Sequence, residues 1–194
     1  MILAHKAFPI VIGGDHSITY PSLLAHEKPL TLIHIDAHLD TWGGAPGNLD
    51  HASWVLRAAK LPNVKKIVQI GMRGLANDQE AIGNARKLHT QIITAEELHR
   101  RGVAWVLAQI QPSENIYISF DVDSMDPTLA PGTGTLEPGG LSFSEIDDLL
   151  MGIPAKGNLI GLDIMEVNPL RDPSGRTAQT AVRLMVDTLG AAFH

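Results

Sequence analysis

The sequence predicts an α/β protein in which helices cover both faces of a mainly parallel β-sheet, giving three layers. The first observation behind this prediction is that the short apolar runs are continuous rather than alternating, as in strands buried on both faces of a parallel sheet. The second is that helical patterns fall between these runs, so strands and helices alternate along the chain. The predicted strands are residues 9–12, 30–36, 66–70, 91–93, 115–121 and 158–164.

Three helices are predicted most clearly between and after these strands. Thr94 and Glu97 have the spacing of a capping box at the start of a helix that runs to residue 110. Ser142 and Glu145 have the same spacing at the start of a helix that runs to residue 151. The last predicted helix covers residues 176–189, and its apolar stripe is expected to face the sheet.

Length and composition narrow the class of protein. The 194 residues suit one domain, residues 1–194, with a sizeable core. The lack of cysteine excludes a disulfide-stabilised secreted scaffold and thiolate metal sites. The formal net charge of −6 argues against a general nucleic-acid binder. No apolar run approaches the ~20 residues of a membrane span, and no secretory pattern is found. We therefore expect a cytoplasmic protein that binds neither nucleic acid nor membrane.

Carboxylate and imidazole side chains follow four of the predicted strands where those strands end. In such folds, ligands bind outside the carboxyl ends of the strands. Four segments therefore deliver metal-binding types of side chain to one edge of the sheet, and we expect a site there. The residues are His16 after the first strand, Asp36, His38 and Asp40 at the second, Asp121 and Asp123 at the fifth, and Asp163 and Glu166 at the sixth.

These residue types indicate metal chemistry. Asp36, His38 and Asp40 share one face of an extended segment, because side chains two residues apart point to the same side. Packing four aspartates together is costly through repulsion unless cations are present, and two divalent ions balance their charge. An oxygen-rich ligand set with two imidazoles favours manganese and leaves nickel, cobalt and zinc open. Two such ions lower the pKa of a shared water molecule, so the sequence predicts metal-assisted hydrolysis.

Five motifs occur in order along nearly the whole chain. They are GGDHS (13–17), HIDAHLD (34–40), SFDVDSMDP (119–127), PGTGT (131–135) and DIMEVNP (163–169). Together they resemble the motifs of the ureohydrolase family, which includes arginase and agmatinase. The resemblance implies an arginase-like fold and the hydrolysis of a guanidino compound to urea and an amine. Members of the family are usually longer, so it also implies that this chain is short at its N-terminus.

The resemblance also implies a role for each site residue. His16 and Asp40 would complete the shell of one metal ion, His38 and Asp123 that of the other, and Asp36 and Asp121 would bridge both. Glu166 would anchor the substrate guanidinium, whose planar fork suits a carboxylate, and Thr135 would assist by hydrogen bonding. In the expected mechanism, the leaving amine takes its proton through Asp123 or from solvent. His51 would transfer protons near the metals, although its sequence context fits a helix cap or a surface position equally well.

The substrate is inferred from one loop. Arginases hold the α-carboxylate of arginine with an Asn and a Ser after the Asp-Ala-His-x-Asp motif. In this chain Trp42 lies near the position of that Asn, and Pro46 lies at that of the Ser. We therefore expect a decarboxylated substrate, agmatine, with urea and putrescine as products, as in polyamine biosynthesis. A guanidino acid such as 4-guanidinobutyrate is the alternative, and it would need a cation such as Arg73 or Arg171 for its distal carboxylate.

Two alternatives come from other classes of function. The chain could be a truncated, non-catalytic subunit, because loss of the first strands of the family fold would leave a sheet edge open. A two-metal phosphohydrolase is the weaker alternative, since no Lys or Arg clamp for phosphate is evident. Because the family forms trimers or hexamers, the resemblance also implies a homo-oligomer.

Overall fold

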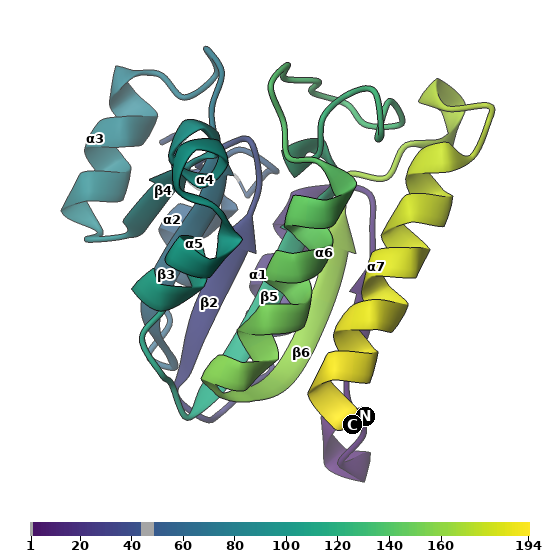
Figure 1. The fold of residues 1–194 in the computed structure, drawn as a ribbon. Coiled ribbons are helices and arrows are strands. Elements are labelled where there is room, and N and C mark those ends of the chain that lie inside the picture. The colour runs from purple at the N-terminus through teal and green to yellow at the C-terminus, as the bar shows by residue number, and fades with distance from the viewer. Residues whose placement is uncertain (1, 44–48) are drawn as a thin grey trace.

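The computed structural model describes residues 2–43 and 49–194, which form one six-stranded sheet with helices on both faces (Figure 1). The strand order is β1-β6-β5-β2-β3-β4, and every pairing between these strands is parallel. The predicted three-layer α/β fold is thereby confirmed. The strands are β1 (Ile10–Ile12), β2 (Leu30–Ile35), β3 (Val64–Met72), β4 (Gln91–Thr94), β5 (Asn115–Asp121) and β6 (Asn158–Met165).

The central strands β2 and β5 are buried along their whole length, as their continuous apolar sequences predict. Their side chains alternate between the two faces of the sheet. Ile33 and Ile118 belong to the core on one face, whereas Leu32 and Tyr117 belong to the core on the other. The same alternation places Asp121, at the end of β5, on the face of Tyr117.

Four helices cover the face of Ile33 and Ile118 (Figure 1). They are α4 (Ala95–Arg101), α5 (Val103–Gln109), α6 (Phe143–Gly152) and α7 (Arg176–Phe193). The two predicted capping boxes are present at the starts of α4 and α6. The helix α7 extends four residues beyond the predicted end at 189, and its Phe193 ring packs edge-on against Phe8 at 5.1 Å between centroids.

The prediction of one continuous helix over residues 94–110 is wrong. The chain divides there into α4 and α5 at Gly102, whose φ is 80° and ψ is 161°. This backbone conformation is essentially limited to glycine and is incompatible with a helix. Both short helices still contribute to the core, through Leu98 and Val106.

Shorter helices cover the opposite face of the sheet. The helices α1 (Thr19–Leu24) and α2 (Trp54–Ala58) bury Leu23 and Trp54 against the core that contains Tyr117. The helix α3 (Gln79–Lys87) packs beside Leu39 and Met72. The 3-10 helices are η1 (Leu3–His5), η2 (His16–Ile18), η3 (Val122–Ser124), η4 (Ile153–Lys156) and η5 (Pro169–Arg171). Within the described ranges, no helix has the length and apolar character needed to cross a membrane.

Candidate metal centre

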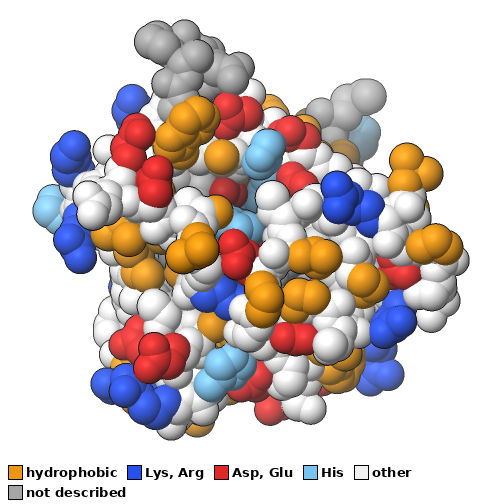
Figure 2. All heavy atoms as spheres, turned by 90° about the horizontal axis from the view of Figure 1, so that it is seen from above, with side chains coloured by type: hydrophobic (Ala, Val, Ile, Leu, Met, Phe, Trp, Pro, Cys, Tyr) orange, Lys and Arg blue, Asp and Glu red, His pale blue; other side chains and the backbone are white. Residues whose placement is uncertain are grey.

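The predicted site residues converge at the carboxyl edge of the sheet. His16 lies on η2 beyond β1, Asp36 follows β2 directly, Asp121 ends β5, Asp123 lies on η3 and Glu166 follows β6. Figure 2 shows this edge from above, with acidic and histidine side chains near its centre. The parallel sheet places the ends of these strands side by side, so segments far apart in the sequence meet there.

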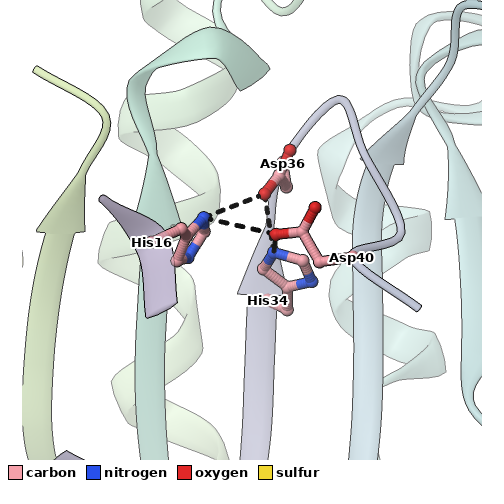
Figure 3. Close-up of side chains that lie close together, drawn as sticks. All are labelled: His16, His34, Asp36 and Asp40. Carbon is pink, nitrogen blue, oxygen red and sulfur yellow. Dashed lines mark hydrogen bonds and ion pairs between the residues drawn. The ribbon is translucent and has the colours of Figure 1, made fainter. Parts of the chain in front are cut away.

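One group of potential ligands consists of His16, His34, Asp36 and Asp40, all of them buried (Figure 3). The His16 Nδ1 atom faces three carboxylate oxygens: Asp121 Oδ2 at 2.9 Å, Asp36 Oδ2 at 3.2 Å and Asp40 Oδ2 at 3.5 Å. One ring nitrogen has a single hydrogen to donate, so it cannot satisfy three carboxylates. A divalent ion among these atoms would be bound by all four of them.

A second group consists of Asp36, His38 and Asp123. The His38 Nδ1 atom lies 3.0 Å from Asp123 Oδ2 and 3.4 Å from Asp36 Oδ1. The Asp36 carboxylate therefore faces both groups, with Oδ2 toward His16 and Oδ1 toward His38. Asp121 is also central, because its Oδ2 contacts His16 and its Oδ1 accepts a hydrogen bond from the Asp123 backbone at 2.7 Å. The residues thus form two ligand groups that share a carboxylate.

The electrostatics of the cluster agree with a site for cations. Burial is the main cause that raises the pKa values of the Asp40 and Asp123 carboxyls above the ordinary aspartate value, and the negative charge of Asp36 is the second. Burial and the neighbouring charges of Asp123 and Asp36 raise the pKa of Asp121 in the same way. Two divalent ions would remove this repulsion, and the oxygen and imidazole donors suit them. The residues present therefore fit a pair of divalent metal ions.

Two aromatic residues that sequence analysis left without a role at the metal site support this cluster. His34 is fully buried, and its Nε2 lies 2.7 Å from Asp36 Oδ2. Its position two residues before Asp36 placed it on the same face of β2 and could have signalled this contact. Trp54 donates from Nε1 to Asp40 Oδ2 at 2.7 Å and stacks on the His16 ring at 4.9 Å. Nothing local in the sequence signals the contact of Trp54 with Asp40.

A cavity of about 120 Å³ opens beside the two ligand groups. Its lining residues are His16, His38, Asp40, His51, Ala52, Ala76, Asp121, Asp123, Thr135 and Glu166. Both predicted substrate-binding residues are among them. Thr135 donates from Oγ1 to Asp123 Oδ2 at 3.0 Å, and Glu166 Oε1 accepts from the His16 backbone at 2.8 Å. Burial raises the pKa of the Glu166 carboxyl.

His51 also lines this cavity, but its side chain is 55% exposed and its Nδ1 lies 3.6 Å from Asp15 Oδ2. It thus connects the cavity with solvent rather than lying among the potential ligands. Asp40 and Glu166 have positive φ angles of 50° and 62°. Such a conformation is uncommon for residues other than glycine, and it concentrates at functional sites.

Other side chains singled out in the sequence lie elsewhere. Arg73 donates to backbone carbonyls, including those of Asp123 at 2.7 Å and Glu137 at 2.8 Å, so its guanidinium braces loops rather than facing the cavity. Trp42 is 46% exposed, and Pro46 lies outside the described residues. Asp163 lies behind His16: its Oδ1 accepts from Ser119 Oγ at 2.7 Å, and that Oγ lies 2.8 Å from His16 Nε2.

Comparison with known proteins shows to which family the chain is similar. Residues 1–190 match the arginase family model. The chain is 37% identical to an agmatinase of Chromobacterium violaceum over 97% of its own length and 59% of that protein. It is also 37% identical to the mitochondrial guanidino acid hydrolase of Homo sapiens, of which it covers 56%.

Solved structures agree with these matches. A hypothetical agmatinase from Burkholderia thailandensis superposes with a TM-score of 0.85 and 37% identity, over 98% of this chain and 61% of that one. An arginase from Bacillus subtilis superposes with a TM-score of 0.88 and 29% identity, over 97% of this chain and 74% of that one. The chain thus spans about three fifths of the curated relatives named above. With this fold and these matches, the chain belongs to the arginase family.

Proposed function

We propose that this protein hydrolyses a guanidino compound to urea and an amine with the help of two divalent metal ions, with agmatine as substrate and putrescine as the amine. The observation that carries the proposal is the pair of ligand groups sharing Asp36, next to a cavity that contains Glu166. Relatives named agmatinase, guanidinobutyrase and guanidino acid hydrolase support the reaction class.

In this proposal, His16, Asp36, Asp40 and Asp121 would hold one ion, and Asp36, His38, Asp121 and Asp123 the other. Manganese is the proposed metal, because the donors are mostly carboxylate oxygens with some imidazole nitrogens. When bound, the ions supply an activated water molecule at neutral pH and stabilise developing negative charge. His34 stays outside both shells and holds the Asp36 carboxylate through its Nε2.

The remaining steps belong to side chains of the cavity. Glu166 binds the guanidinium, and its burial strengthens the attraction by lowering the local dielectric. Thr135 holds the Asp123 carboxylate through a hydrogen bond, and Asp123 passes a proton to the leaving amine. His51, which is half exposed, exchanges protons between this cavity and solvent.

The lack of a Lys or Arg in the described lining of the cavity supports agmatine over a guanidino acid. Its described lining carries four carboxylates (Asp40, Asp121, Asp123 and Glu166) and neither Lys nor Arg. Bound metal ions would balance three of these carboxylates, and Glu166 would pair with the guanidinium, so a distal carboxylate on the substrate would find no cationic partner in this lining. Guanidino acid hydrolysis is retained as the second candidate, because the human guanidino acid hydrolase and the bacterial agmatinase are equally similar at 37% identity.

The proposal also includes a cytoplasmic homo-oligomer of three or six copies that acts in polyamine biosynthesis. Relatives named agmatinase support the role in polyamine biosynthesis, whereas the number of copies and the compartment rest on the sequence-based expectation. Native mass spectrometry of the purified protein measures the number of copies, and a monomer at micromolar concentration would contradict the oligomer. Fractionation of the source cells tests the compartment.

The experiment that tests the reaction is urea release after manganese loading, with agmatine, arginine and 4-guanidinobutyrate as substrates and a chelated control. We expect metal-dependent urea from agmatine. Preference for 4-guanidinobutyrate would keep the reaction class and change the substrate. No urea from any compound, with two metal ions bound, would favour a non-catalytic subunit.

The variant Asp121→Ala tests the assignment of the metal ligands. Asp121 contacts both ligand groups, so its loss should abolish tight binding of the metal pair together with hydrolysis. The matched control is Asp148→Ala, at an exposed position of α6, which should change neither. Metal content by mass spectrometry and urea release are both measured, and retained activity in Asp121→Ala would contradict the model.

A further inference from the structure

One nitrogen of the second ligand group has no partner in this arrangement. His38 turns its Nδ1 toward Asp123 and Asp36, while its Nε2 is buried without a hydrogen-bond partner among the described residues. Burying a ring N–H without an acceptor is costly. Imidazoles that bind metals almost always donate their second N–H to a carboxylate, a carbonyl or water. The Oε1 atom of Glu137 lies 3.9 Å from His38 Nε2.

Two neighbouring residues place Glu137 near His38: one binds its backbone and the other leaves room for its side chain. Arg73 donates from a single nitrogen, Nη2, to the backbone carbonyls of Glu137 at 2.8 Å and Asp123 at 2.7 Å, which ties the two loops together. Gly74, with a φ of 79°, leaves the space that the Glu137 carboxylate occupies. A Cβ atom at Gly74 would collide with all three atoms of that carboxylate. The Glu137 carboxylate thus lies in space that a side chain at position 74 would take from it.

We propose that Glu137 is the positioning residue for His38: its carboxylate accepts the hydrogen bond from His38 Nε2 and so directs Nδ1 toward the metal. This inference rests on the proposed function, because it treats His38 as a ligand. Closing the 3.9 Å separation to an ordinary 2.9 Å needs a movement of about 1 Å. The Glu137 side chain is 21% exposed and has freedom for such a movement.

The consequence of this hydrogen bond is a fixed tautomer and ring orientation. With the proton held on Nε2, the Nδ1 lone pair is available to a metal ion. The charged acceptor also makes the imidazole a stronger ligand. Removal of such a partner typically weakens metal binding 10–100-fold. Glu137 therefore sets the affinity of the ion shared by His38 and Asp123, without touching substrate.

Calorimetric titration of the metal-free full chain with Mn²⁺ tests this inference. Glu137→Met and Glu137→Gln keep the length of the side chain, but only glutamine keeps an acceptor oxygen. We expect Glu137→Met to bind its second Mn²⁺ about 10–100-fold more weakly than the wild type, and Glu137→Gln to stay within about 5-fold. Glu96→Gln, at an exposed position of α4, removes the same charge and should change nothing. Thermal unfolding of the metal-free variants checks that each one is folded.

The outcomes separate this inference from the proposed function. Unchanged affinity for the second Mn²⁺ in Glu137→Met would overturn the role of Glu137 and leave the two-metal site standing. An equal loss in Glu137→Met and Glu137→Gln would also overturn it, because glutamine can still accept the hydrogen bond. A wild type that binds fewer than two Mn²⁺ ions would overturn the proposed function itself.

Discussion

Replacement of Trp54 by phenylalanine tests how much the contacts of this side chain with Asp40 and His16 contribute to the stability of the fold around the candidate metal centre. Trp54 is fully buried, donates from Nε1 to Asp40 Oδ2 at 2.7 Å, and stacks on His16 with 28° between the ring planes. Its ring also meets His34 edge-on at 5.0 Å. Phenylalanine keeps an aromatic ring but has no N–H, so the change removes the donor to Asp40 and part of the packing.

The expected loss in the free energy of unfolding of Trp54→Phe follows from these contacts. A lost hydrogen bond to the Asp40 carboxyl costs about 1–3 kcal/mol, depending on its charge. Replacing the indole of Trp54 by a phenyl ring leaves roughly 40 Å³ empty, which adds about 1 kcal/mol at the usual cost per unit of cavity volume. The free energy of unfolding should therefore fall by about 2–4 kcal/mol.

The assay is urea-induced unfolding followed by circular dichroism, with a chelator present so that metal binding adds no stability. Trp105→Phe is the matched control, because Trp105 is half-buried on α5 and carries Arg101 over its ring at 4.4 Å. The control should lose about 0.5–1 kcal/mol. A loss in Trp54→Phe no larger than that of the control would refute the role assigned to its hydrogen bond.

Three further predictions concern backbone conformation, pH and the substrate. Gly102→Ala should lower the free energy of unfolding by about 1–3 kcal/mol, because φ is 80° at that residue. Gly83→Ala should raise the free energy of unfolding by about 0.5–1 kcal/mol, because Gly83 lies inside α3 with open space around it. Urea unfolding compares the two variants, and equal effects would contradict this prediction. Hydrogen bonds from Ser174 and Thr177 lower the pKa of Asp172 from 3.8 to about 2. The ionised Asp172 therefore stabilises the fold fully above its unfolded-state pKa, and this stabilisation is lost as the pH falls toward 2. Asp172→Asn should flatten the dependence of stability on pH between these two pKa values, and an unchanged dependence would count against this assignment. Glu166→Gln should keep both metal ions but release urea at least about 100-fold more slowly, because a neutral amide cannot form an ion pair with the substrate guanidinium. Full activity of this variant would exclude Glu166 as the residue that binds the guanidinium.

Sequence patterns predicted the sheet well because the signal for a buried parallel strand is local. All six predicted strands overlap observed ones, and the central run 115–121 coincides with β5. The differences lie at the ends, as in β3, where pairing with β2 and β4 extends the strand to residues 64–72. The short helices α1 and α2 have too few residues for a periodic pattern, and α4 and α5 were merged because a glycine inside a helical pattern does not reveal its φ.

The location of the candidate site was also predictable from the sequence by itself. These residues lie at or just beyond the ends of strands, and parallel strands bring their carboxyl ends to one edge; they are His16, Asp36, His38, Asp121 and Glu166. Spacing alone then indicates which types of side chain meet there. The resemblance of five motifs to one family assigned the expected roles, which remain predictions for each residue.

Only the tertiary structure decided which partners hold those side chains. The contact of Trp54 with Asp40, the bracing of two loops by Arg73, and the approach of Glu137 to His38 all join segments separated by loops. No local pattern encodes such a contact, because it depends on how two elements pack and on the direction of each side chain. The positions of the strands follow from local burial, and the edge where the site lies follows from the direction of the chain. The hydrogen bonds that orient the candidate metal-binding side chains exist only once the layers are packed together.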